Sequence, residues 1–135
     1  MAAWRDLVRF IEAAYDVTKR EPDEIRVRVH YGGEDVDDDE RTQIAVIARE
    51  DVDGQEWVQI ATPFALAADV NVAAVLHEIG ATTVVGGAVI MGDYLVLRHS
   101  LPLENLDLNE FTEPLELVAG SAELLEEMFT GGDDY

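Results

Sequence analysis

The sequence predicts a single α+β domain, an antiparallel sheet of about five strands flanked by helices. Two observations lead to this fold class. Segments with helical periodicity lie near both ends and in the middle of the chain. Segments of alternating or β-branched residues lie between them, and most are joined by short turn sequences, as in hairpins. The expected element order is α-β-β-β-α-β-β-α.

The first element is predicted to be an amphipathic helix. Its apolar residues recur at helical spacing and comprise Trp4, Leu7, Val8, Ile11, Ala14 and Tyr15. Lys19 and Arg20 are expected near its C-terminal end, where cations interact favourably with the helix dipole. Pro22 is expected to end the helix.

Three strands are predicted to follow. The first covers residues 25–31, where apolar residues alternate with Arg26, Arg28 and His30. The second and third cover residues 42–49 and 56–62, with the hairpin sequence Asp51-Val52-Asp53-Gly54 between them. Pro63 is expected to close this pair.

A second helix is predicted from Val72 onward, with Asp69 or Asn71 as its N-cap and Gly80 just beyond its end. Residues 83–91 and 94–101 then form the expected last hairpin, with Gly92-Asp93 at the turn. The pair Gly86-Gly87 indicates a bulge or a late strand start.

The final helix is predicted to begin near Asp107, which forms a D-x-x-E capping pattern with Glu110. Its main apolar stripe consists of Leu108, Phe111, Leu115, Val118, Ala122, Leu125 and Phe129. Pro114 is expected to kink or break the helix. Residues 1–130 thus make up the domain, and residues 131–135 are expected to be a flexible tail.

Composition narrows the class of function. The 135 residues include 29 acidic and nine basic side chains, for a net charge of −20, and no cysteine. This acidity argues against nucleic acid and against an anionic membrane surface as partners. No apolar run is long enough to span a bilayer, and the N-terminus does not resemble a signal peptide, so we expect a cytoplasmic protein.

No arrangement of residues predicts catalysis, a metal site or a cofactor. The histidines His30, His77 and His99 lack partners at ligand spacing, so structural roles are expected for them. Neither Ser100 nor Ser121 lies in a nucleophile-elbow sequence. The sequence therefore predicts a protein that is not an enzyme.

The acidic segment Glu34–Glu40 has Asp35, Asp37 and Asp39 at alternate positions, as in half of an EF-hand loop. The required Gly and bidentate Glu are replaced by Glu40 and Val46, so a solvated run of charges is the better interpretation.

Two features point to binding. Arg26, Arg28 and His30 share one face of a predicted strand, and either pair with acidic neighbours across the sheet or recognise an acidic segment of a partner. The final helix also has a second apolar row beside its main stripe, formed by Leu117, Leu124 and Met128. This row is either additional core or, together with Val72 and Val75 of the second helix, an interface for a partner or a second subunit.

The segment Gly92–Asp107, with "LRHSLPLENLDL", and the helix end "ELLEEMF" resemble the YbjN-type proteins, a family related to the dimeric chaperones of type III secretion. The resemblance implies a homodimeric fold that binds a protein or peptide client and has no catalytic residues. The leading hypothesis is a chaperone-like adaptor that holds a segment of a partner. The alternatives are a homodimeric regulatory or structural protein without a client and, less favoured, a small enzyme.

Overall fold

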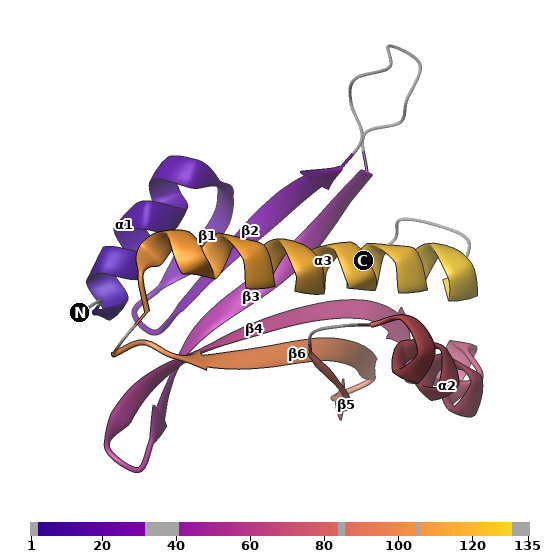
Figure 1. The fold of residues 1–135 in the computed structure, drawn as a ribbon. Coiled ribbons are helices and arrows are strands. Elements are labelled where there is room, and N and C mark those ends of the chain that lie inside the picture. Colours follow the sequence, from indigo (N-terminus) through magenta and orange to yellow (C-terminus); the bar gives the residue numbers. More distant parts are fainter. Residues whose placement is uncertain (1–2, 32–40, 84–85, 105, 131–135) are drawn as a thin grey trace.

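The computed structural model describes residues 3–31, 41–83, 86–104 and 106–130 and confirms the α+β fold class. These residues form a six-stranded antiparallel sheet and three α-helices (Figure 1). In chain order the elements are α1 Trp4–Ala14, β1 Asp16–Glu21, β2 Glu24–Tyr31, β3 Arg41–Val52, β4 Gln55–Leu66, η1 Ala67–Asp69, α2 Val72–Thr82, β5 Gly87–Met91, β6 Tyr94–Pro102, η2 Leu108–Phe111 and α3 Thr112–Thr130.

The strands lie in the order β1-β2-β3-β4-β6-β5, with every neighbouring pair antiparallel. The last hairpin therefore enters the sheet through β6, which pairs with β4, and β5 lies at the outer edge. The opposite edge is β1.

The core lies between the sheet and the helices. α3 runs lengthwise over the sheet (Figure 1), where it packs on β3, β4 and β6. The largest fully buried apolar side chains are Leu7, Ile11, Ile25, Ile47, Ile60, Phe64, Leu95, Leu97, Leu103, Phe111 and Leu115. The alternate residues of the strands point to the other face of the sheet, where a groove of about 450 Å³ is lined by residues that include Ile44, Val46, Ala61 and Val96.

The first helix is shorter than predicted, and a sixth strand takes its place. α1 ends at Ala14, so Lys19 and Arg20 lie in β1 and not at a helix end. The β-branched residues Val17 and Thr18 favour the extended conformation. Pro22 lies in the tight turn between β1 and β2, so it ends a strand and not a helix.

The β3–β4 hairpin is longer than predicted. Asp53 and Gly54 form its turn with φ values of 51° and 83°, as their sequence predicted. However, β4 continues through Pro63 to Leu66, with an irregularity in its pairing with β6 between Pro63 and Ala65. Proline is tolerated there because the β3–β4 ladder ends at the Val46–Ala61 pair, so the missing amide interrupts no pair of that ladder.

The boundaries of α2 and β5 are partly as expected. Asn71 is confirmed as the N-cap of α2, since its Oδ1 accepts a hydrogen bond of 3.1 Å from the amide of Ala74. Gly80 is not beyond the helix, because α2 continues to Thr82. Of the two readings of Gly86-Gly87, the late strand start is observed, because β5 begins at Gly87.

The predicted final helix is divided into two elements just before Pro114, where a kink or a break was expected. The 3-10 helix η2 ends at Phe111 and α3 begins at Thr112, so Pro114 lies in the first turn of α3. The missing amide hydrogen has no intrahelical acceptor in that turn, and proline is therefore accommodated. The predicted side-chain cap of Asp107 is not formed. The main-chain carbonyl of Asp107 instead accepts a 2.9 Å hydrogen bond from the amide of Glu110. The segments 34–40 and 131–135 lie outside the described residues.

Candidate protein-binding site

Helix α3 has one buried face and one exposed apolar face. The inward side chains, which include Leu115, Val118, Ala122 and Leu125, are buried in the core. The second row is not: the exposed fractions are 39% for Leu117, 64% for Leu124 and 57% for Met128. The second apolar row predicted from the sequence is therefore exposed, and no other described part of the chain covers it.

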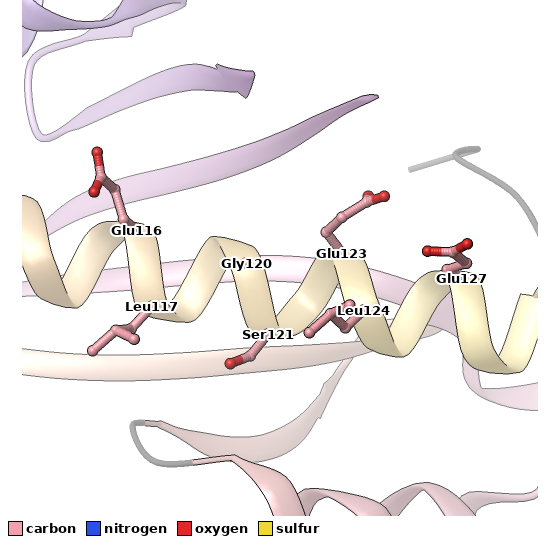
Figure 2. Close-up of a pocket in the computed structure, with 7 residues that line it drawn as sticks. All are labelled: Glu116, Leu117, Gly120, Ser121, Glu123, Leu124 and Glu127. Carbon is pink, nitrogen blue, oxygen red and sulfur yellow. The ribbon is translucent and has the colours of Figure 1, made fainter. Parts of the chain in front are cut away.

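A groove of about 500 Å³ runs along this outer face. Its lining residues are Glu116, Leu117, Gly120, Ser121, Glu123, Leu124 and Glu127. Figure 2 shows the side chains of Leu117, Ser121 and Leu124 on one side of the helix and those of Glu116, Glu123 and Glu127 on the other. The small residues Gly120 and Ser121 lie between the two leucines, so the helix surface is low at that point.

The glutamates of this groove were not among the residues predicted for the site. A signal was present in the sequence, since residues 112–130 contain five glutamates and neither lysine nor arginine. This composition indicates an acidic helix, and the structure leaves Glu113, Glu116 and Glu127 exposed. The prediction had considered only the apolar stripes.

The second helix contributes less than expected. Val75 is fully buried and packs in the core, so its prediction as an interface residue is wrong. Val72 is half-buried and packs against the core, whereas Leu76, which was not predicted, is exposed. The residues that line the α3 groove include none from α2, so the structure does not unite the two predicted apolar patches there.

The basic stripe of β2 is paired within the chain. Arg26 Nε lies 3.1 Å from Glu24 Oε2, and Arg28 Nη1 lies 4.0 Å from Asp16 Oδ2. His30 Nε2 lies 3.3 Å from the same Asp16 oxygen. All three basic side chains remain more than a third exposed, so each pair contributes little to stability. Of the two readings of this stripe, the structure shows pairing with the protein's own carboxylates.

Two residues considered for catalysis, His99 and Ser100, are neighbours on β6. Ser100 Oγ donates a 3.0 Å hydrogen bond to Glu50 Oε1, while its neighbour His99 points toward the opposite face of the sheet because side chains alternate along a strand. Within the described ranges, no group of three or more His, Asp or Glu side chains is placed to hold a metal ion. The Asp35, Asp37 and Asp39 pattern lies outside those ranges.

The fold and the groove define this chain as an α+β protein with an acidic, partly apolar helix surface. No helix in the described part of the chain is both long and apolar enough to cross a membrane. No protein-family model matches the chain, and no curated protein matches its sequence. The resemblance to YbjN-type proteins therefore stays a prediction.

Proposed function

We propose that this chain is a non-catalytic binding module, a chaperone-like adaptor that holds a segment of a partner protein on the outer face of α3. The observation that carries the proposal is the contrast between two adjacent residues: Leu124 is 64% exposed, whereas Leu125 is 3% exposed. The proposed relation to YbjN-type proteins and a cytoplasmic location are consistent with this role.

The energetics of the exposed row support binding. Burying an apolar side chain of this size contributes about 1.5–3 kcal/mol. Leu117, Leu124 and Met128 lie on one stripe of a single helix, so one partner segment can cover all three. The groove between Leu117 and Leu124 gives such a segment a concave surface to contact.

The test is affinity capture from the native lysate with the unmodified chain and two variants. Leu124→Gln removes the most exposed apolar side chain of the row, and Leu76→Gln makes the same change at an exposed site on α2. A specific partner should be lost with Leu124→Gln and retained with Leu76→Gln. If both variants retain every partner, the outer face of α3 is not the binding surface.

A second candidate is a homodimer that forms through the edge strand β5. The two edges of the sheet differ sharply: four of the six residues of β1 are charged, whereas none of the five residues of β5 is. Charged residues protect an edge strand against pairing with another chain, whereas an uncharged apolar edge strand is available for such pairing. Ile90 and Met91 of β5 are 59% and 45% exposed.

A second copy suits this edge because the chain carries a net charge of −20 and β5 is a place where two copies can meet without opposing carboxylates. In an antiparallel pairing centred on Val89, Ile90 would lie opposite Ala88 of the second copy and Met91 opposite Gly87. Each large side chain would then face a small one, which permits close packing.

Because the chain lacks cysteine, Val89→Cys tests this pairing directly. Mild oxidation should link two Val89→Cys chains covalently, whereas Val52→Cys, an exposed position in the β3–β4 hairpin, should stay monomeric. Ile90→Lys should shift sedimentation toward the monomer. Equal crosslinking at both cysteine positions would contradict a specific dimer.

A further inference from the structure

The negative charge of this protein is unevenly distributed along the chain. Residues 1–49 contain twelve acidic and eight basic side chains, whereas residues 50–135 contain seventeen acidic side chains and a single basic one, Arg98. Helix α3 lies in the acidic part and has five glutamates without any lysine or arginine; Glu113, Glu116 and Glu127 are exposed, whereas Glu123 and Glu126 are buried. A partner on its outer face therefore approaches a strongly negative surface.

The groove on α3 also has the geometry that receives a facing helix. Leu117, Gly120, Ser121 and Leu124 are spaced i, i+3, i+4 and i+7, and four residues at this spacing form the hole that accepts one side chain of a packed helix. The two central members are small, so the hole is open. Gly120, Glu123, Leu124 and Glu127 form a second hole one turn further along.

A helical occupant is favoured over an extended one. The main-chain donors and acceptors of α3 are used within the helix, so its outer face offers no edge for a β-strand to pair with. The apolar anchors Leu117, Leu124 and Met128 are spaced by seven and four residues, which places them on a single stripe along the helix axis.

From these observations we infer that the groove binds a basic amphipathic helix, an inference that rests on the proposed function and specifies its partner. One apolar stripe of the partner would fill the two holes, and lysine or arginine side chains beside that stripe would pair with Glu116 and Glu127, both exposed at the groove. A second copy of α3 does not fit here, because it would place glutamates against glutamates.

The inference can be tested with three synthetic helical peptides of about 18 residues, long enough for about five turns. All three carry leucines at the same i, i+3 and i+7 positions, and the remaining positions are mostly lysine, glutamine or glutamate. Fluorescence anisotropy should give the tightest dissociation constant for the lysine peptide and the weakest for the glutamate peptide. Sodium chloride should weaken the lysine peptide's binding.

Two double variants with the same net charge distinguish the effect of the groove carboxylates on peptide binding from the effect of the protein's overall charge. Changing Glu116 and Glu127 to glutamine should weaken the binding of the lysine peptide by about twofold to thirtyfold, since two exposed ion pairs of about 0.2–1 kcal/mol each are lost. Changing Glu110 and Glu113, exposed carboxylates that do not line the groove, gives the same net charge and should change binding less than about twofold. Leu124→Gln should weaken binding, and Leu76→Gln should not.

Two results would overturn the inference while leaving the proposed function intact. One is equal binding of the glutamate and lysine peptides. The other is capture of a Leu124-dependent partner from the lysate whose contacting segment is acidic or extended. If the peptides do not bind and no partner depends on Leu124, both the inference and the proposed function are wrong.

Discussion

The side-chain amide of Gln43 donates a 2.8 Å hydrogen bond to the main-chain carbonyl oxygen of Pro63. Gln43 is fully buried on β3, and Pro63 lies in β4 beyond the last regular pair of the two strands, Val46–Ala61. A side chain thus replaces a ladder bond at the point where proline interrupts the pairing. The two strands stay joined under α3 although their backbone pairing has ended.

Gln43→Leu should lower the free energy of unfolding by about 1–3 kcal/mol, because it removes the donor and leaves the Pro63 carbonyl without that partner. The exposed Gln55 at the start of β4 provides the control, and Gln55→Leu should change stability by less than about 0.5 kcal/mol. Urea denaturation measures both. Equal effects at the two positions would show that the Gln43–Pro63 bond does not stabilise the hairpin.

Adjacent leucines of α3 should respond very differently to truncation. Leu125→Ala should cost about 2–5 kcal/mol, because it opens a cavity in the core. Leu124→Ala should change the free energy of unfolding of the isolated chain by about 0.5 kcal/mol or less, because this side chain is exposed and alanine favours the helix. Denaturation at low protein concentration checks both. A large decrease in the free energy of unfolding for Leu124→Ala would mean that Leu124 stabilises the single chain, and would count against its role as a partner-binding residue.

The pKa of Tyr15 lies above the ordinary tyrosine value, chiefly because burial disfavours the phenolate. A hydrogen bond with Thr112 lowers this pKa, and the negative charge of Glu116 raises it further. Because the unfolded chain loses the phenolic proton first, the contribution of Tyr15 to stability is complete below a pH of about 10 and declines as pH rises from there through the folded pKa.

Tyr15→Phe should therefore reduce the loss of stability in alkaline solution and leave the pH dependence near neutrality unchanged. Urea denaturation across the alkaline range, with tyrosinate absorbance as a second readout, measures this difference. An identical alkaline decline in both proteins would assign it to other groups.

Salt should stabilise the folded chain at neutral pH. A net charge of −20 imposes repulsion between carboxylates that is greatest in the compact state, and added ions screen it. The melting temperature should rise between low and moderate sodium chloride. A melting temperature that does not respond to sodium chloride would contradict this prediction.

Local patterns were sufficient to predict most elements of this fold. Alternation of side chains identified β2, the Asp53-Gly54 turn identified the β3–β4 hairpin, and Asn71 marked the start of α2. These signals are strong because each depends on the conformational preferences of a few neighbouring residues. The exposed row of Leu117, Leu124 and Met128 was also visible in the sequence, as a stripe too wide for one sheet contact.

By itself, then, the sequence determined the fold class, most of the elements and the existence of a surplus apolar row on the last helix, because periodicity is a local property. Only the tertiary structure decided that residues 16–21 form an edge strand and that Pro63 lies within β4, because both depend on which neighbouring strand supplies or omits a hydrogen bond. It also decided that Val75 is core while Leu124 is exposed. The two side chains are similar in hydrophobicity, and their burial depends on which face of each helix meets the sheet.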